Sequence, residues 1–303
     1  MKNLKSHSAL MKPKLSVVVG SHNARASIGE CLTALESQQK GAEVEIIVVD
    51  NSTDGTAETI RRQFPTVKLV RSPTSNFIPE LWGIGIDQSA GDIIAITTAH
   101  CVPNKNWIEE ILKAHETHYP GIGGAIENDE SAGFVEWAVY FCRYSHFMLP
   151  FPKGTVREIP GDNASYKRWA MDRCGPVRRN GFWEPMIHAE LRKDGLQLLM
   201  TPAIVVCHKK SFGVTAFMKQ RFWHGRQFGS TRASDLSPMG RMIYIIFSPL
   251  IPVLFLSRIT RQVLTKRRHI KQFFLSLPIL ILFLLSWSTG ELTGYLWTLN
   301  KKG

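Results

Sequence analysis

Two short apolar runs of the sequence each end in side chains that could bind a ligand. Residues 15–19 and 46–49 are rich in Val and Ile, and the polar residues that follow them are Ser21, Asn23, Asp50 and Ser52. Continuous apolar runs are typical of buried parallel strands, whose carboxyl ends meet at the sheet edge where α/β proteins bind ligands. We therefore expect a nucleotide pocket around Asp50, although Asp50 could instead cap the turn before a helix at Thr56.

The elements that must position these residues alternate between strands and helices. Strands are predicted at 15–19, 46–50, 67–70, 92–96 and 121–126, and helices at 26–39, 56–63, 81–88 and 107–118. This alternation predicts an α/β fold with a mostly parallel sheet and helices on both faces. Residues 128–160 are aromatic and Pro-rich, which indicates a loop-rich segment over the sheet edge. A helix at 186–193 and a strand within 196–207 follow.

Six segments in this order resemble the family 2 glycosyltransferases with a GT-A fold. They are Ser16–Asn23, Val48–Thr56, Gly91–Ala95, Pro160–Arg168, Phe182–Glu184 and Lys219–Arg226. The resemblance covers roughly residues 15–230. It implies that Asp50 contacts the base of a nucleotide-diphosphate sugar, and that Ser21, Asn23 and Ser52 belong to the same donor pocket. Asp162 and Asn163 match a turn near the donor sugar and the acceptor, or else they cap a helix beginning near Ala164.

The resemblance also implies a DXD motif, two carboxylates that hold Mg²⁺ or Mn²⁺ against the donor diphosphate. In this chain Thr98 and His100 stand at the two acidic positions. His100 could still bind a metal through its neutral imidazole, which suits Mn²⁺ better than Mg²⁺, with His208 as its partner. Lys209 could instead neutralise the diphosphate, and both histidines could be ordinary residues at strand ends. A divalent metal is therefore possible but doubtful.

The expected catalytic residue is Glu184, which precedes Gly195 by the spacing that the family shows between its catalytic acid and a later glycine. The resemblance implies a general base that deprotonates an acceptor hydroxyl. The alternative is a carboxylate favoured at a helix N-terminus, with Pro185 next to it. A base favours a hydroxyl acceptor over a polyprenyl phosphate, which is already anionic.

Residues 220–224, Gln-Arg-Phe-Trp-His, resemble the QxxRW motif of processive enzymes, but Trp-His replaces its Arg-Trp. This departure argues against long-chain processive synthesis. Arg221 and Arg226 could close over the diphosphate or seat an amphipathic helix at lipid headgroups. We favour the membrane interpretation.

The positive charge of the chain is concentrated in its last third. The net charge is +12, whereas residues 208–303 carry 15 Lys and Arg against two acids, so residues 1–207 are close to neutral. This charge alternates with apolar runs at 242–257 and 273–289, which favours anionic lipid over nucleic acid as a partner. The first run would reach only about 24 Å as a helix, short of the ~30 Å hydrocarbon core.

A basic link at 258–272 joins the two apolar runs. The positive-inside rule keeps this link on the cytoplasmic side, so the first run is expected to be re-entrant or interfacial. The second run is expected to span the bilayer or turn back. The alternative is a buried helical hairpin of a soluble domain.

The predicted organisation is an N-terminal extension at 1–14, a GT-A domain at 15–230 and a membrane-associated helical hairpin at 231–303. Five scattered cysteines and the lack of a signal peptide favour a cytoplasmic catalytic domain at the inner or plasma membrane. The expected activity is inverting transfer of a sugar to a hydroxyl of a surface-polysaccharide or lipid-linked saccharide precursor. The alternatives are a polyprenyl-phosphate glycosyltransferase and a catalytically silent protein that binds nucleotide sugar.

Overall fold

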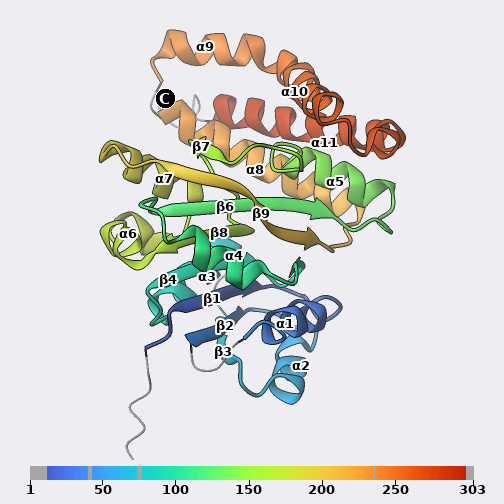
Figure 1. The fold of residues 1–303 in the computed structure, drawn as a ribbon. Coiled ribbons are helices and arrows are strands. Elements are labelled where there is room, and N and C mark those ends of the chain that lie inside the picture. The colour runs from blue at the N-terminus through green and yellow to red at the C-terminus, as the bar shows by residue number, and fades with distance from the viewer. Residues whose placement is uncertain (1–11, 40–42, 74–76, 235, 298–303) are drawn as a thin grey trace, which may run out of the picture. The chain divides into compact units, whose positions relative to one another are not determined.

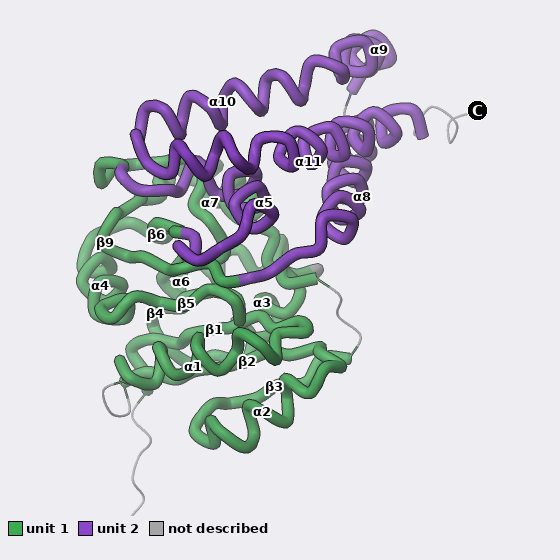
Figure 2. Tube along the Cα trace, turned by 90° about the vertical axis from the view of Figure 1, so that its right-hand side faces the viewer, with its two compact units in different colours: residues 1–127, 151–209 green, residues 128–150, 210–303 purple. Residues whose placement is uncertain are grey.

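The computed structural model describes residues 12–39, 43–73, 77–234 and 236–297. The chain forms two compact units, one of residues 1–127 and 151–209 and the other of residues 128–150 and 210–303 (Figure 2). Most of the predicted N-terminal extension lies outside the described residues. The predicted boundary at residue 230 falls within one continuous helix, and the predicted domain limits stay a prediction.

The first half of unit 1 alternates strands and helices as predicted (Figure 1). Its elements are β1 Leu15–Ser21, α1 Ile28–Glu36, β2 Val44–Asp50, α2 Thr56–Gln63, β3 Lys68–Arg71, α3 Ile78–Asp87 and β4 Ile93–Thr98. Strands β3, β2, β1 and β4 lie side by side and pair in parallel. The pairing sets Ser21 opposite Asp50 and Gly20 opposite Thr98, so the polar strand ends share one edge.

The strands after β4 make the sheet mixed. The remaining elements of unit 1 are β5 Cys101–Pro103, α4 Trp107–Ala114, β6 Gly121–Asn128, β7 Gly154–Val156, β8 Asn163–Lys167, α6 Arg168–Arg173, η2 Val177–Asn180, α7 Glu184–Lys193 and β9 Leu198–His208. The sheet order is β3-β2-β1-β4-β8-β6-β9-β5, with β7 also on β9. Strand β8 runs antiparallel to both β4 and β6, and β9 runs antiparallel to β5 and β7.

The parallel strands are buried because helices cover β-branched side chains. Val17, Val18 and Val19 on β1 have no exposed surface. Each buried side chain of this size contributes about 1.5–3 kcal/mol relative to exposure. Helix α3 approaches β1 so closely that a Cβ on Gly85 would lie 2.2 Å from Cγ1 of Val18. The absence of a side chain at Gly85 therefore fixes how near this helix sits to the sheet.

The prediction that residues 128–160 are loop-rich was wrong, because the segment contains helix α5, Phe134–Tyr144, and strand β7. Trp137, Tyr140 and Phe141 on α5 are all buried. The Phe141 ring lies 5.4 Å from that of Phe273, on the last helix of the chain. A helix buried on several faces has no single apolar stripe, so its period is weak in the sequence.

Apart from Asn128 at the end of β6, the regular elements in the described part of unit 2 are helices. Its C-terminal elements are α8 Val214–Ser234, α9 Pro238–Phe247, η3 Ser248–Leu250, α10 Ile251–Lys266 and α11 Ile270–Trp297. Within this unit, α11 lies between the outer α9–α10 layer and a layer formed by α5 and α8 (Figures 1 and 2). The predicted basic link 258–272 is mostly helix, because α10 continues to Lys266 and α11 begins at Ile270.

Candidate active site

The loops that follow β1 and β2 are joined by hydrogen bonds. The backbone N–H of Asn23 donates to Oγ of Ser52 at 2.7 Å. The backbone N–H of Thr53 donates to the side-chain Oδ1 of Asn23 at 3.1 Å. Asn23 adopts a left-handed backbone with φ 47°, which Asn tolerates better than most residues. The structure therefore brings Ser21, Asn23, Asp50 and Ser52 together at one edge of the sheet.

Asp50 is fully buried and is held by two neighbours. Arg71 forms an ion pair with its Oδ2, and the hydroxyl of Ser52 donates to Oδ1. Arg71 also donates to the Ser52 carbonyl at 2.9 Å. The sequence analysis did not identify Arg71, although its position at the end of the strand beside β2 was a usable signal. The buried hydroxyl of Ser21 has no hydrogen-bond partner among the described residues, which leaves it available to a ligand.

A second cluster surrounds the hydroxyl of Thr98 at the end of β4. Its Oγ1 lies 3.2 Å from Nε2 of His100, 3.2 Å from Oδ1 of Asp162 and 3.3 Å from Sγ of Cys101. The ligating atoms of His100, Cys101 and Asp162 all lie within 4.8 Å of one another. The His208 ring lies 5.0 Å from that of His100, edge-on. Asp162, from a distant part of the chain, thus supplies a carboxylate beside Thr98 and His100, where the resemblance leads one to expect the DXD acids.

These side chains form a nitrogen, sulfur and oxygen donor set, which decides the metal that would fit. Imidazole and carboxylate groups suit Mn²⁺, and a thiolate suits Zn²⁺, whereas Mg²⁺ prefers oxygen ligands. The group therefore fits a transition-metal ion better than Mg²⁺. The sequence analysis paired His100 with His208 and placed Asp162 at the donor sugar, so it missed the proximity of His100 to Asp162.

Glu184 begins helix α7 and lies beside the same cluster. A Cβ on Gly161 would lie 2.1 Å from Oε1 of Glu184 and 2.8 Å from the Trp82 ring, so the carboxylate packs against the backbone next to Asp162. Trp82 in turn donates to the Thr97 carbonyl at 2.6 Å. The predicted base and the predicted diphosphate residues therefore share one edge of the sheet.

Two sets of contacts hold Glu184 in place. Before it, the Phe182 amide donates to the Pro79 carbonyl at the start of α3, at 2.7 Å. One turn after it, the buried His188 bonds to the Tyr166 hydroxyl at 2.8 Å and to Oε2 of Glu158 at 2.6 Å. The sequence analysis did not identify the chain Glu158–His188–Tyr166, because no local motif joins its three segments.

Two other predicted donor residues make contacts that favour structural roles. The amide of Asn163 accepts from Trp107 at 2.8 Å and donates to the carbonyls of Ala125 and Ile204, at 2.8 Å and 3.2 Å. These contacts join β8 to β6 and β9. The Lys209 ammonium lies 2.7 Å from Oε2 of Glu30 in an ion pair.

Arg221 and Arg226 belong to unit 2, on helix α8. The Arg221 guanidinium lies over the Trp287 ring at 4.2 Å, and that of Arg226 lies over the Trp297 ring at 4.5 Å. Both residues therefore contact α11 through cation–π interactions. This contact favours the membrane-segment interpretation of the two arginines over the diphosphate interpretation.

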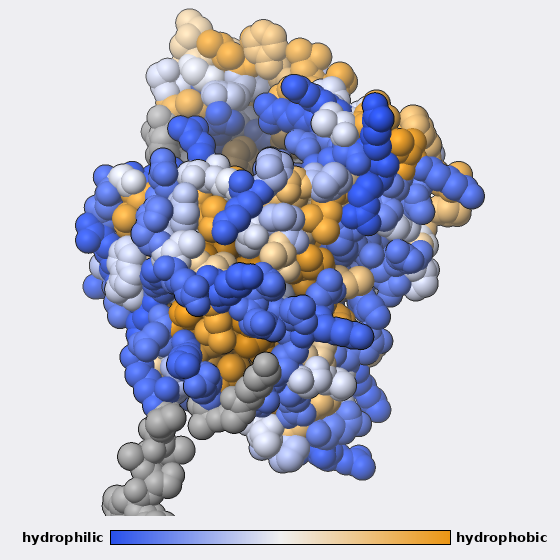
Figure 3. All heavy atoms as spheres, in the orientation of Figure 1, coloured by the Kyte–Doolittle hydropathy of each residue, from blue (hydrophilic) through white to orange (hydrophobic). Residues whose placement is uncertain are grey.

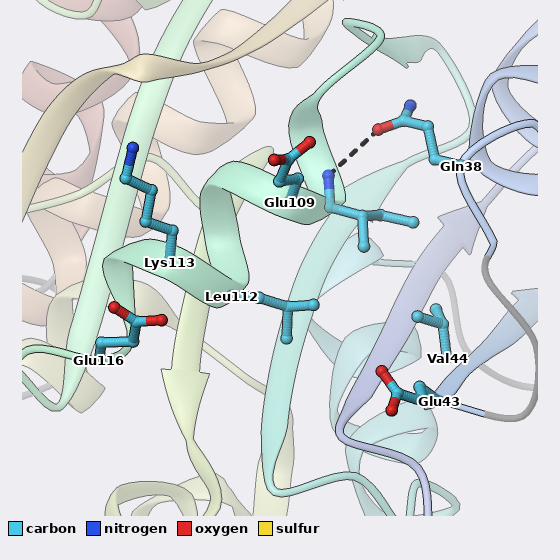
Figure 4. Close-up of a pocket in the computed structure, with 8 residues that line it drawn as sticks. Gln38, Glu43, Val44, Glu109, Leu112, Lys113 and Glu116 are labelled. Carbon is cyan, nitrogen blue, oxygen red and sulfur yellow. Dashed lines mark hydrogen bonds between the residues drawn. The ribbon is translucent and has the colours of Figure 1, made fainter.

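A well-formed cavity lies elsewhere in unit 1, between α4 and the start of β2 (Figure 4). At the rim of this cavity, the side-chain carbonyl of Gln38 accepts a hydrogen bond from the backbone N–H of Ile108. The lining includes Glu43, Glu109 and Glu116, whose charge opposes a diphosphate. Because the cavity lies near the amino end of β2 and Asp50 ends that strand, this cavity is not the predicted donor site.

Comparison with known proteins identifies the family. The family described as "Glycosyl transferase family 2" matches residues 16–174, a little over half of the chain. The chain belongs to glycosyltransferase family 2. The matched residues include both loops of the Asp50 pocket and the His100–Asp162 cluster.

Two curated relatives are also glycosyltransferases. Glycosyltransferase AglE of Haloferax volcanii is 33% identical over 122 residues, which cover 38% of this chain and 40% of that protein. Polypeptide N-acetylgalactosaminyltransferase 10 of Rattus norvegicus is 22% identical over 193 residues, which cover 57% of this chain and 31% of that protein. The chain thus matches less than half the length of either relative.

Solved structures confirm the predicted GT-A-type fold of this family 2 glycosyltransferase. The mannosyltransferase PcManGT from Pyrobaculum calidifontis, in complex with GDP-Man and Mn²⁺, aligns with a TM-score of 0.56 and 16% identity, over 93% of this chain and 87% of that one. S. aureus TarS 1–349 with UDP-GlcNAc aligns with a TM-score of 0.50 and 14% identity, over 92% and 90% of the two chains.

Proposed function

We propose that this glycosyltransferase inverts the anomeric centre as it transfers one sugar from a nucleotide-diphosphate donor. The acceptor is a hydroxyl of a surface-polysaccharide or lipid-linked saccharide precursor at the cytoplasmic face of the membrane. The observation that carries the proposal is the convergence of three groups at one sheet edge: the Asp50 pocket, the His100–Asp162 cluster and Glu184. A donor with a base, a diphosphate and a reacting sugar needs these three kinds of contact. The GDP-Man and UDP-GlcNAc bound by the two solved neighbours support this donor class.

In this proposal the nucleotide base binds between the loops after β1 and β2. Asp50 accepts a base N–H, because each carboxylate oxygen has two lone pairs and Arg71 and Ser52 occupy only one on each. The ion pair with Arg71 fixes the orientation of the carboxylate. The unpaired Ser21 hydroxyl adds a donor or acceptor beside it.

The diphosphate binds next to Thr98, His100 and Asp162. A divalent cation held by His100 and Asp162 would offset the negative charge that grows on the departing nucleotide diphosphate. The Mn²⁺ in the PcManGT complex supports this assignment. The chain's own contribution is to orient both ligands through the Thr98 hydroxyl, which contacts each of them.

Glu184 acts as the general base. It removes the proton from the acceptor hydroxyl as that oxygen attacks the anomeric carbon, and the bond to the diphosphate breaks on the opposite side. One displacement inverts the anomeric configuration. A polyprenyl phosphate acceptor would not need this proton transfer, so the presence of a positioned carboxylate favours a hydroxyl.

The decisive experiment compares Glu184→Gln with Glu190→Gln, a change on the same helix at a residue that pairs with Lys193. Transfer is measured by mass spectrometry with a panel of nucleotide sugars and membrane-extract acceptors, and donor binding by calorimetry. We expect Glu184→Gln to lower turnover by about 10²–10⁴-fold with little change in donor Kd, and Glu190→Gln to retain activity.

Equal turnover in the two variants would reject Glu184 as the base. Transfer to polyprenyl phosphate alone would assign the enzyme to that acceptor class. Donor binding without turnover in the parent protein would instead identify a catalytically silent member, which the missing DXD acids keep as an alternative.

A further inference from the structure

The outer helices of unit 2 expose a continuous apolar stripe. Its members recur every three or four residues through α9, η3 and α10, in places as adjacent pairs, and Figure 3 shows apolar surface over α9. We call them the outer stripe: Met239, Met242, Ile243, Ile246, Phe247, Leu250, Val253 and Leu254. Each has more than two-fifths of its surface exposed, and Met239 reaches 73%. Large apolar side chains gathered in this way mark an interaction surface.

Helix α11 has the length and composition of a membrane span, and although side chains such as Phe274 and Leu285 are exposed, one face of it is tightly packed. A Cβ on Gly290 would lie 2.1 Å from the Phe222 carbonyl, and one on Gly225 would lie 2.3 Å from the Trp287 carbonyl. The Ser286 hydroxyl also donates to the Met218 carbonyl at 2.7 Å. The C-terminal half of α11 therefore contacts α8 directly along its length.

Helix α8 could not accompany α11 into hydrocarbon at low cost. It carries five basic or imidazole side chains: Lys219, Arg221, His224, Arg226 and Arg232. Each arginine or lysine at the bilayer centre costs about 2.5–3.5 kcal/mol even on the lower insertion scales. The α8–α11 contact thus opposes a transmembrane position for α11.

The register of the hairpin also leaves too little apolar length for two spans. The Ser288 hydroxyl donates to the Ser248 carbonyl at 2.8 Å, and the Tyr244 and Tyr295 rings stack at 5.7 Å, so the helices are antiparallel. This register sets residues 247–257 against residues 279–289. The two uncharged runs overlap over about 16 Å, roughly half of the ~30 Å hydrocarbon core.

The charge of the hairpin selects the kind of surface that covers the outer stripe. From residue 236 to residue 290 the sequence has seven Lys and Arg and no Asp or Glu. Arg258 and Arg261 are exposed and follow Leu254 at helical spacing. By contrast, Lys266 caps α5 by donating to the carbonyl of His146 at 2.8 Å and to those of Ser145 and Met148. An apolar stripe that is followed by exposed arginines fits the surface of an anionic bilayer. There the apolar side chains can enter the acyl region while the arginines contact the anionic headgroups.

We propose that α9–α10 lies in the plane of an anionic bilayer and that α11 does not cross it. The outer stripe enters the acyl boundary, Arg258 and Arg261 contact lipid phosphates, and α11 supports the outer helices from behind. This inference rests on the membrane location in the proposed function and states how that location is reached.

Sedimentation with lipid vesicles tests the surface. The purified full chain is mixed with phosphatidylcholine vesicles, or with vesicles containing about 30% phosphatidylglycerol. We expect tighter binding to the anionic vesicles, and a loss of at least about tenfold in the double variant Ile246→Glu with Val253→Glu. Trp169→Glu places the same charge on an exposed aromatic residue of unit 1 and should bind like the parent. Arg258→Glu with Arg261→Glu should remove the preference for anionic lipid.

Labelling from outside the cell separates an in-plane hairpin from a spanning one. Lys271→Cys puts an exposed thiol beside the turn between α10 and α11, and the parent protein reports the background of the native cysteines. We expect a membrane-impermeant maleimide to label this thiol only after permeabilisation, because an in-plane hairpin keeps the turn cytoplasmic. If α11 alone crossed the bilayer, the end of this helix would lie outside, so Trp297→Cys, at an exposed residue there, tests that case and should also be labelled only after permeabilisation. Labelling in intact cells would overturn the proposal.

Equal vesicle binding by the parent and the Ile246→Glu, Val253→Glu variant would also overturn it. Donor binding by the same preparations in detergent is measured separately. Loss of donor binding in the parent would count against the proposed function, whereas loss of the lipid response alone would count against the membrane surface.

Discussion

His100 lies in the turn after β4 and Asp162 in the turn before β8, but both contact Oγ1 of Thr98, at 3.2 Å each. Strand β8 pairs antiparallel with β4, setting Asn163 opposite Thr97, and this pairing delivers Asp162 to the end of β4. A carboxylate and an imidazole can therefore replace two carboxylates at the same place. The replacement changes the expected metal preference, because a mixed nitrogen and oxygen set favours Mn²⁺ over Mg²⁺.

At the residue scale we predict that Mn²⁺ binds the purified protein and that His100→Ala weakens this binding at least about tenfold. Electron paramagnetic resonance of free Mn²⁺ measures the affinity without reference to turnover. His118→Ala removes an exposed histidine stacked on Tyr119 and should leave binding unchanged. Identical affinities in the two variants, or transfer that EDTA does not affect, would remove His100 as an essential ligand.

At the element scale, helix α7 carries Glu184 at its first turn and His188 one turn later. His188 is fully buried, and its two ring nitrogens contact Tyr166 on β8 and Glu158 before it. The helix is thus anchored to the strand that also brings Asp162 to the site. We infer that His188 positions the base relative to the donor.

We predict that His188→Gln lowers kcat about tenfold or more with little change in donor Kd, because a displaced base affects the transition state more than donor binding. Tyr166→Phe removes only the hydroxyl and should have a smaller effect of the same kind. Steady-state kinetics with calorimetric donor titrations separates the two quantities. A parallel loss of donor affinity and folded protein would indicate a purely structural role for His188.

The pairing of α8 with α11 depends on glycine at their contact. A Cβ added at Gly290 would meet the Phe222 carbonyl at 2.1 Å, whereas one added at Gly213 would meet only the Ala216 Cβ, at 4.0 Å. We predict that Gly290→Ala lowers the free energy of unfolding by about 1–3 kcal/mol, since the helices must separate to accept the methyl group. Thermal unfolding in detergent compares it with Gly213→Ala, which should resemble the parent. Equal melting temperatures would mean that this close contact does not stabilise the hairpin.

At the scale of the whole molecule, positively charged residues and exposed apolar side chains are unevenly distributed along the chain. Residues 208–303 hold the excess of positive charge, and unit 2 holds most of the exposed large apolar side chains. Unit 1 instead buries polar and titratable groups, among them His115, which is 6% exposed and contacts the Ser165 hydroxyl at 2.9 Å. These buried groups couple folding to pH.

We predict that the stability of the folded chain falls below about pH 6.5 because of His115. Burial, reinforced by the nearby charge of Lys167, lowers the pKa of His115 to about 3. The unfolded chain, with a His pKa of about 6.5, therefore binds a proton first. The stabilisation that neutral His115 gives the folded chain is fully present above about pH 6.5. Below that pH the free energy of unfolding falls by ~1.4 kcal/mol per pH unit until the pH approaches 3. The free energy of unfolding, measured with urea at pH 5 and pH 7, should differ less between the two pH values for His115→Gln than for the parent. Equal pH differences would contradict this role.

Local pattern was sufficient for much of the fold and part of the site. The β-branched runs before Ser21 and Asp50 predicted the parallel strands and their shared polar edge, because side-chain period and strand direction are local properties. The same reasoning failed for α5, whose aromatic residues are buried on several faces by a helix about 130 residues later in the sequence. It also missed Arg71 and His188, whose partners lie on other elements.

The sequence by itself determined an α/β glycosyltransferase with polar residues such as Asp50 at one sheet edge and a basic apolar tail, since strand period, motif order and charge are encoded in neighbouring residues. Only the tertiary structure decided that Asp162 meets His100, that His188 anchors the helix of Glu184, and that one face of α11 packs closely against α8. These outcomes depend on antiparallel strand pairing and on close helix contacts between distant segments, which no local spacing specifies.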